Sequence, residues 1–231
     1  MKSLVIIPAY NEEENIVGTV RDIREHAPDF DYIIINDCSR DNTLSVCREQ
    51  GLHVISLPIN LGIGGAVQTG YRYAEKNGYD IAVQFDGDGQ HDAAYLNIMR
   101  DMLLEQQLDM VIGSRFIKKE GFQSSGIRRL GIRYFSRLIF WMTGKHICDP
   151  TSGMRMGNRS VIESFAHNYP KDYPEPESIV MLLRRGKKIA ECPVKMRERQ
   201  AGVSSISLGK SIYYMFKVTV AIMIERLRKD Q

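Results

Sequence analysis

The chain contains 231 residues with a formal net charge of +3; 43% of the residues are hydrophobic and 26% are charged. This composition is typical of a soluble globular protein with one domain or one and a half. No window approaches the roughly 20 apolar residues that span a bilayer, so we do not expect an integral membrane protein. The four cysteines lack metal-ligand spacing and the N-terminus lacks a secretory pattern, so we expect a cytoplasmic protein with reduced thiols.

The formal charge is divided unevenly between the two halves of the chain. Residues 1–114 contain 8 Lys or Arg against 18 Asp or Glu, whereas residues 115–231 contain 23 against 10. This asymmetry predicts that the second half faces an anionic partner such as phosphate groups, nucleic acid or an acidic membrane surface. The alternative is two solvated halves that attract each other. No nucleic acid partner is expected, because the chain has no zinc-finger spacing and no RNP aromatic pattern.

Continuous apolar runs predict buried strands at residues 3–8, 32–35, 53–57, 81–85 and 110–113. The segments between them have helical spacing: the first helix is expected to begin with Asn11 as its N-cap, and the last to cover residues 93–106. This alternation predicts an α/β, Rossmann-like fold in which a mostly parallel sheet has helices on both faces.

Polar residues follow four of these strands where each ends: Tyr10-Asn11-Glu12, Asn36-Asp37, Asp86-Gly87-Asp88 and Ser114-Arg115. The carboxyl ends of parallel strands lie at one edge of a sheet, where such folds bind ligands, so we expect these residues to converge. Asp86 and Asp88 are two residues apart, and both carboxylates can therefore face one hard cation such as Mg²⁺ or Mn²⁺. The alternative is an Asp-Gly turn.

Two nucleotide-binding motifs are incomplete. Gly62-x-Gly64 is followed by Val67 where a dinucleotide fingerprint needs its third glycine, so NAD and FAD are not supported. Gly209-Lys210-Ser211 is similar to the end of a P-loop, but Ser204 stands where that motif needs glycine.

Two segments of the basic half combine apolar and cationic residues. Over residues 127–144, apolar residues at positions 127, 130, 134, 138 and 141 follow helical spacing, with arginines at 128, 129, 133 and 137. This predicts a basic amphipathic helix at a membrane interface, with a core-packed helix as the alternative. Residues 212–224 are apolar apart from Lys217 and too short to span a bilayer. They predict an anchor on acidic lipid or a helix that binds a partner.

Two further segments of this half carry carboxylates. Cys148–Gly153 places Asp149 before a turn-forming proline. Tyr173–Glu177 is expected to be extended, with two prolines holding Glu175 and Glu177. The alternative in each case is an ordinary surface loop.

Seven motifs occur in order between residue 4 and about residue 205. They are Pro8-Ala9-Tyr10-Asn11-Glu12, Asp37-x-Ser39-x-Asp41, Asn60-x-Gly62-x-Gly64-Gly65-Ala66, Asp86-x-Asp88-x-Gln90-His91, Gly113-Ser114-Arg115, Asp149-Pro150-Thr151-Ser152-Gly153 and Arg199-x-x-Gly202-x-Ser204. Together they resemble the family 2 inverting glycosyltransferases, and among these the polyprenyl-phosphate sugar transferases of the dolichyl-phosphate mannose synthase type. Asn36 is a departure, because the family usually has another aspartate there.

The resemblance implies a GT-A domain over residues 1–205, followed by a tail at 206–231 that associates with the membrane or binds a partner. Within the domain, residues 1–114 would bind the nucleotide sugar and residues 115–205, with the amphipathic helix 127–144, would bind the acceptor.

It also implies a role for each matching residue. The donor would contact Pro8, Tyr10, Glu12, Asp37, Gly65 and Asp86. A divalent metal, Mg²⁺ or Mn²⁺, would bind Asp86, Asp88 and Gln90. The acceptor and its phosphate would contact Arg115, Arg128, Arg199 and Ser204; arginine suits this role because its planar fork binds phosphate oxygens in pairs. Asp149 and Asp88 are the catalytic candidates.

The function predicted in this way is transfer of one sugar from a nucleotide sugar, such as UDP-GlcNAc or UDP-Glc, to undecaprenyl or a similar polyprenyl phosphate. It would take place at the cytoplasmic membrane face, by a peripherally associated enzyme of cell-envelope glycan synthesis. A lipid phosphate is largely ionised at neutral pH and needs cations to position it more than it needs a base. Because the tail is too short to span the bilayer, we also expect a small membrane protein as a partner.

Three alternatives remain. A transferase that extends a glycan at a sugar hydroxyl would need a general base, which would be Asp149 or Glu175. A nucleotidyltransferase is less favoured because the chain has Pro-Ala-Tyr-Asn-Glu where such an enzyme needs a glycine-rich phosphate loop. A scaffold without activity is disfavoured because Asp86 and Asp88 are both present.

Overall fold

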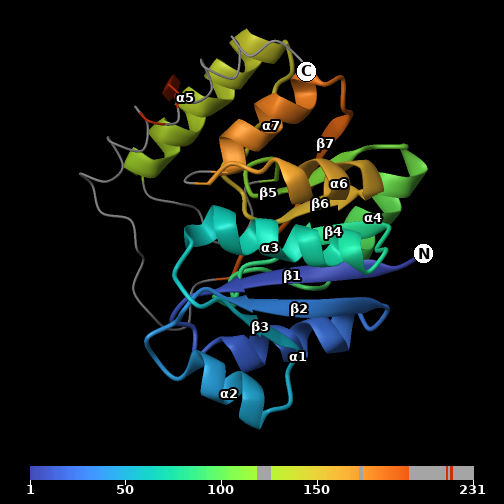
Figure 1. The fold of residues 1–231 in the computed structure, drawn as a ribbon. Helices are drawn as coiled ribbons and strands as arrows, with labels where there is room; N and C mark the ends of the chain where they lie inside the picture. The colour runs from blue at the N-terminus through green and yellow to red at the C-terminus, as the bar shows by residue number, and fades with distance from the viewer. Residues whose placement is uncertain (119–125, 172–173, 198–216, 218, 221–231) are drawn as a thin grey trace.

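The computed structural model describes residues 1–118, 126–171, 174–197, 217 and 219–220, with backbone alone for 126–128. Within them, one seven-stranded sheet has the order β3-β2-β1-β4-β6-β5-β7 (Figure 1). The strands are β1 (Ser3–Ala9), β2 (Phe30–Asn36), β3 (Val54–Ser56), β4 (Ile81–Gln84), β5 (Met110–Ser114), β6 (Arg155–Asn158) and β7 (Ile189–Pro193). The helices are α1 (Ile16–His26), α2 (Thr43–Glu49), α3 (Gly62–Lys76), α4 (Tyr95–Glu105), α5 (Gly126–Thr143), α6 (Arg159–His167) and α7 (Pro174–Arg184).

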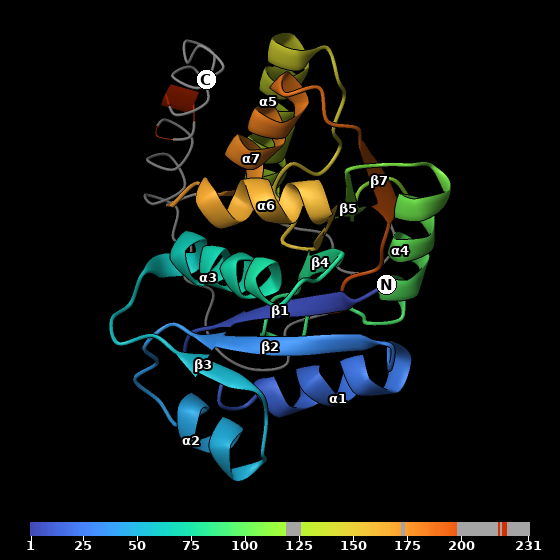
Figure 2. The ribbon, with the colours of Figure 1, turned by 45° about the vertical axis from the view of Figure 1, so that its right-hand side comes forward.

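Each face of the sheet buries its own apolar core, because successive residues of a strand point to opposite faces. In β1, Leu4 and Ile6 join the core formed with α3, α5, α6 and α7, whereas Val5 and Ile7 join the core formed with α1, α2 and α4. Figures 1 and 2 show α3 and α6 on one side of the sheet and α1 and α2 on the other. The predicted α/β class, the mostly parallel sheet and the helices on both faces are therefore confirmed.

One strand runs against the others. β6 is antiparallel to both β4 and β5, whereas the other ladders are parallel. The sequence pattern does not predict this strand, because Arg155–Asn158 is short and polar at both ends. Since β6 runs against β4 and β5 and starts near the point where they end, the residues just before it lie at the carboxyl edge of the sheet. Its position between β4 and β5 also separates their ends by about 10 Å.

Two local predictions are wrong. The helix expected to start at Asn11 begins at Ile16, and Asn11 has a φ of 58° in the turn before it. In the segment expected to be extended, Tyr173 lies outside the described residues and α7 begins at Pro174. Proline fits the first turn of a helix, where backbone N–H groups have no intrahelical partner, and acidic residues there suit the positive end of the helix dipole.

The basic helix α5 has apolar residues on more than one side. Ile132, Phe135 and Ile139 are buried in the core, whereas Leu130 and Trp141 of the predicted stripe are 64% and 66% exposed. Leu138 of the stripe packs partly against the core, so the predicted stripe is divided between the packed side of α5 and its exposed side. Among the described residues, none of the helices has both the length and the apolar character needed to cross a bilayer.

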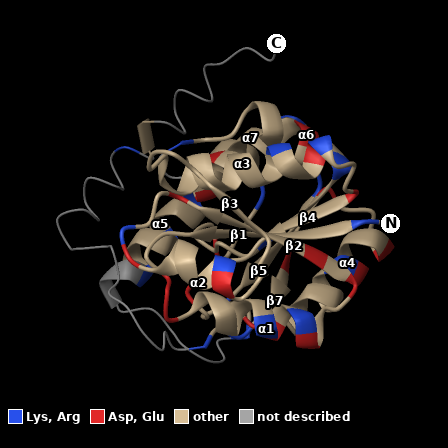
Figure 3. Ribbon diagram, turned by 60° about the horizontal axis from the view of Figure 1, so that its bottom comes forward, with Lys and Arg blue, Asp and Glu red and all other residues tan. Residues whose placement is uncertain are grey.

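Charged residues lie mainly on the helices and loops that surround the sheet, whose strands carry few of them (Figure 3). The tail predicted at residues 206–231 falls outside the described residues except for Lys217, Thr219 and Val220. Of these, Thr219 meets α5 through its hydroxyl, which lies 2.9 Å from the Tyr134 hydroxyl. The proposed division of the chain at residues 114 and 205 stays a prediction.

Candidate active site

The loops after β1 and β2 are joined by hydrogen bonds at the carboxyl edge of the sheet. The Arg40 backbone N–H donates to Asn11 Oδ1 at 2.8 Å, and the Glu12 N–H donates to Thr43 Oγ1 at 2.9 Å. The Glu12 carboxylate accepts a further hydrogen bond from Asn15 Nδ2. Tyr10 remains 41% exposed at this edge, so its ring is available to a ligand.

Two other predicted donor contacts, Pro8 and Gly65, and the family departure Asn36 are buried or partly buried. Pro8 is buried inside β1, where it pairs with Ile35 of β2. Gly65 lies in the first turns of α3 against the side chain of Leu61, and a Cβ at residue 65 would collide with it. Asn36, which departs from the family pattern, is buried and donates from Nδ2 to Ser56 Oγ at 2.9 Å.

Asp37 follows β2 directly and shapes the start of α3. Its side chain is buried, and its two carboxylate oxygens accept the N–H groups of Leu61 and Gly62 at 2.7 and 2.8 Å. Its carbonyl oxygen accepts from Asn60 Nδ2 at 3.0 Å. In this structure the carboxylate therefore holds the β3–α3 loop, and its contact with a nucleoside stays a prediction.

Asp86 follows the end of β4 and is oriented by two partners. Gln84 Nε2 donates to one carboxylate oxygen at 3.1 Å, and His91 Nε2 lies 3.3 Å from the other. Burial by itself raises the pKa of Asp86, but the contacts with His91 and Gln84 and the charge of Arg115 bring it below its ordinary value. The side chain is still 35% exposed, so an ionised carboxylate faces the open edge. The sequence interpretation missed the orienting roles of Gln84 and His91, although both lie within or next to the motif.

Asp88 and Gln90 lie beside this carboxylate in a tight turn. Asp88 Oδ1 accepts the Gln90 N–H at 3.1 Å, and Gly89 between them has a φ of 73°, which favours glycine. Within the described part of the chain, no group of three His, Cys, Asp or Glu side chains comes together as a metal site. A Mg²⁺-type site needs only one or two carboxylates besides substrate phosphates, and Asp86 and Asp88 would supply them.

Arg115 and Asp149 form a buried ion pair next to the end of β5. Arg115 Nε and Nη2 each lie 2.6 Å from an oxygen of Asp149, and the Arg115 N–H donates to the same carboxylate at 3.1 Å. Asp149 is 0% exposed, and Thr151 Oγ1 also contacts the pair. Glu191 accepts the Asp149 backbone N–H. In this arrangement Asp149 faces Arg115 rather than open space, which suits an orienting role better than that of a general base.

Arg155 connects the loop of Asp149 to α7 and was missed by the sequence interpretation. It is 1% exposed, and its guanidinium donates to the carbonyl oxygens of Pro150, Ser152 and Glu175 at 2.9, 2.7 and 2.5 Å. It also donates to Ser178 Oγ at 2.8 Å. A lone arginine after a glycine-containing loop gives no signal in the sequence that its side chain points inward.

Two further residues complete the arrangement around Asp86. Gly153 lies so close that an added Cβ would collide with the Asp86 carboxylate, which explains why the loop needs glycine there. Glu175, in the first turn of α7, has its pKa raised by burial and further by the charge of Asp86, whereas Arg155 and Arg115 oppose this rise. A carboxyl group with a raised pKa therefore lies within electrostatic range of Asp86 and Arg115.

Three predicted phosphate contacts cannot be placed. Arg199 and Ser204 lie outside the described residues, and Arg128 lies in the first turn of α5, where only the backbone is described.

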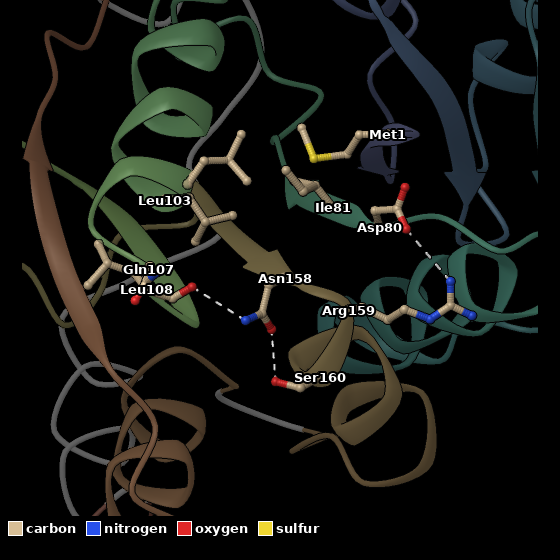
Figure 4. Close-up of a pocket in the computed structure, with 10 residues that line it drawn as sticks. Met1, Asp80, Ile81, Leu103, Gln107, Leu108, Asn158, Arg159 and Ser160 are labelled. Carbon is tan, nitrogen blue, oxygen red and sulfur yellow. Dashed lines mark hydrogen bonds and ion pairs between the residues drawn. The ribbon is translucent and has the colours of Figure 1, made fainter.

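A pocket of about 430 Å³ lies at the opposite edge of the sheet, near Met1 and Ile81. Figure 4 shows that its polar residues interact with each other, as Asn158 does with Ser160. This pocket is not part of the candidate site.

The fold defines the class of protein. Glucosyl-3-phosphoglycerate synthase from Mycobacterium tuberculosis, solved in complex with Mn²⁺, UDP-glucose and phosphoglyceric acid, matches with a TM-score of 0.75. It is 18% identical, and the match covers 100% of this chain and 81% of that chain. The fold is that of the GT-A glycosyltransferases, as the sequence interpretation predicted.

The family follows from sequence comparison. The model described as glycosyl transferase family 2 matches residues 4–165, and the chain belongs to this family of glycosyltransferase enzymes. An undecaprenyl-phosphate mannosyltransferase of Micrococcus luteus is 27% identical, covering 99% of this chain and 98% of that protein. A UDP-N-acetylglucosamine–dolichyl-phosphate N-acetylglucosaminyltransferase of Methanococcus voltae is also 27% identical, covering 97% of this chain and 96% of that protein.

Proposed function

We propose that this enzyme transfers a single sugar, with inversion, from a nucleotide sugar to a polyprenyl phosphate at the cytoplasmic face of the membrane. The names of the two sequence relatives support the polyprenyl-phosphate acceptor. A UDP-sugar donor such as UDP-GlcNAc or UDP-Glc is supported by the Methanococcus voltae relative and by the UDP-glucose complex of the structural neighbour. In this proposal the product belongs to cell-envelope glycan synthesis.

The metal part of the proposal rests on Asp86 and Asp88. They are close in sequence, partly exposed and held in a tight turn, which fits a hard divalent cation. When bound, Mg²⁺ or Mn²⁺ would stabilise the negative charge that develops on the departing nucleoside diphosphate. The protein's own contribution is to hold the Asp86 carboxylate ionised and oriented through Gln84 and His91.

The observation that best supports a phosphate group as the acceptor is the ion pair of Arg115 and Asp149. A hydroxyl acceptor would need an accessible base, but both oxygens of Asp149 bind the Arg115 guanidinium and the side chain is fully buried. A phosphate monoester, whose second pKa is about 6, needs no such base. In the proposed mechanism Asp149 orients Arg115 beside the diphosphate site, and Arg128, Arg199 and Ser204 would hold the remaining phosphate oxygens.

Membrane association is proposed to come from α5 and the tail. Leu130 and Trp141 are largely exposed on α5, and Arg133 and Arg137 are exposed on the same helix. Apolar and cationic side chains together suit the surface of an acidic bilayer. The tail at residues 206–231 would add an anchor or bind a small membrane protein.

A second candidate is transfer to a sugar hydroxyl, and Glu175 is the observation that favours it. A carboxyl group whose pKa is raised by burial is a candidate general base, and this one lies within electrostatic range of Asp86. The two candidate functions therefore predict different effects of Glu175→Gln on kcat/KM: a small effect for a phosphate acceptor and a large one for a hydroxyl acceptor.

The test is a transfer assay with labelled nucleotide sugars and either undecaprenyl phosphate or a glycan acceptor, with Mg²⁺ or Mn²⁺. We expect the label to appear in the organic extract as a sugar lipid. Asp88→Asn should lower kcat/KM by at least about 100-fold, and Glu175→Gln should lower kcat/KM by less than about tenfold. Glu163→Gln, at an exposed position on α6, is the control. Absence of any labelled lipid, or a loss above about 100-fold in Glu175→Gln with label on the glycan, would refute the lipid-phosphate proposal.

A further inference from the structure

The loop between β3 and α3 exposes a run of aliphatic side chains. Ile59, Leu61 and Ile63 are 62%, 46% and 38% exposed. Exposed apolar side chains are ordinary when scattered singly, but a contiguous group marks a site of interaction. In Figures 1 and 2 this connection lies on the side of the molecule where β1 ends, which is the edge that carries the candidate site.

Several polar groups of the same loop are hydrogen-bonded inside the protein. The buried Asp37 carboxylate accepts the N–H groups of Leu61 and Gly62. The Asn60 side chain donates to the Asp37 carbonyl oxygen and accepts the Gly62 N–H at 3.2 Å. Because these groups are already paired, they lower the desolvation cost of bringing this part of the loop against an apolar phase. The same bonds hold the loop in place with its aliphatic chains outward.

Each end of the loop lies near an exposed cation. The Cys38 thiol contacts the Pro58 carbonyl oxygen at 3.8 Å, and Arg40, two residues further on, is exposed. At the other end, Gly64 packs so closely against the backbone carbonyl of Lys171 that a Cβ would collide with it, and Lys171 is exposed. Positive charge beside apolar side chains is complementary to a bilayer surface with anionic headgroups.

We propose that residues 58–63 insert into the surface of an acidic bilayer and turn the catalytic edge toward the membrane. This inference rests on the proposed function, because a lipid-linked phosphate must reach that edge from the bilayer. It adds to α5 and the tail a contact made by the nucleotide-binding half. Two contacts on opposite halves of the domain fix its orientation, whereas one contact would leave it free to rotate.

The experiment compares two double variants of the full chain. Ile59→Gln with Ile63→Gln removes two of the aliphatic chains and leaves the Asp37 hydrogen bonds in place. Ile98→Gln with Leu104→Gln is the matched control, because these side chains on α4 are 53% and 45% exposed. Binding is measured by co-sedimentation with vesicles of phosphatidylcholine with and without phosphatidylglycerol. We expect about tenfold weaker binding to the anionic vesicles for the loop variant and wild-type binding for the control.

Four results would overturn the proposal: unchanged vesicle binding in the loop variant, an equal loss in the control, weaker nucleotide-sugar binding in the absence of lipid, or a change in oligomeric mass. The last two would assign the loop to the donor site or to a second copy of the chain. Transfer to a short-chain prenyl phosphate in detergent is measured in parallel. If wild-type protein does not transfer, the proposed function fails; if both proteins transfer but bind vesicles equally, only the loop proposal fails.

Discussion

Replacing Arg155 by methionine removes a buried cation while keeping a side chain of similar length. The guanidinium donates to the carbonyl oxygens of Pro150, Ser152 and Glu175 and to Ser178 Oγ. After the substitution, the Glu175 oxygen still accepts from the Ser178 hydroxyl at 3.2 Å, but the other two carbonyl groups lose the guanidinium in a buried site. Each such loss costs about 1–3 kcal/mol. The folded protein no longer has to desolvate the arginine charge, which offsets part of this cost. We therefore expect the free energy of unfolding to fall by about 2–4 kcal/mol.

The assay is urea unfolding followed by circular dichroism, with an exposed arginine four residues further along as the control. The side chain of Arg159 is 54% exposed and contacts Asp80 and Glu163 at 3.8 and 3.4 Å. Arg159→Met should therefore cost less than about 1 kcal/mol. Arg155→Lys should lie between the two, because an ammonium group cannot match the planar fork. If Arg155→Met is no less stable than Arg159→Met, the guanidinium does not hold the loop to α7 as described.

Two further changes test the site and the opposite edge of the sheet. Gly153→Ala should place a methyl group against the Asp86 carboxylate and lower kcat/KM by about 100-fold or more. The control Gly18→Ala, where nothing lies within 4 Å, should keep full activity and gain up to about 1 kcal/mol of helix stability; equal activity of the two variants would contradict the close packing at Asp86. For Asp109, burial alone raises the pKa, but the Lys188 backbone N–H and neighbouring groups bring it below 3.8. A carboxyl group whose pKa is lowered by folding stabilises the folded protein at pH values above its ordinary pKa. This stabilisation is lost as the pH falls through the pKa of the folded state. Asp109→Asn should therefore lower the urea midpoint at neutral pH and have little effect in strong acid, and an equal effect at both would be contrary to this reasoning.

The sequence was most informative where clusters of polar residues directly follow apolar strands. Continuous apolar strands, each followed by a polar cluster, predicted both the parallel sheet and the edge where Asp86 and Arg115 lie. The position of Arg155 could not be predicted, because an arginine beside a short strand is usually exposed and only tertiary packing turns it inward. Arg115 and Asp149 are 34 positions apart in the sequence. No local sequence pattern therefore shows that these two side chains form an ion pair. The start of α7 was missed because two prolines indicated an extended chain, whereas Pro174 occupies the first turn of a helix.

The antiparallel strand β6 also has a consequence for synthesis of the chain. β5 pairs with β6 and β7, both made later, and β4 pairs on one side with β6. A nascent chain that ends before Arg155 therefore contains β5, whose five residues are all buried in the finished protein, with neither of its neighbours. Unpaired apolar strands of this kind associate readily with other chains. Emergence of residues 155–158 from the ribosome is thus the earliest point at which the centre of the sheet can close, and until then β5 remains open to association with other chains.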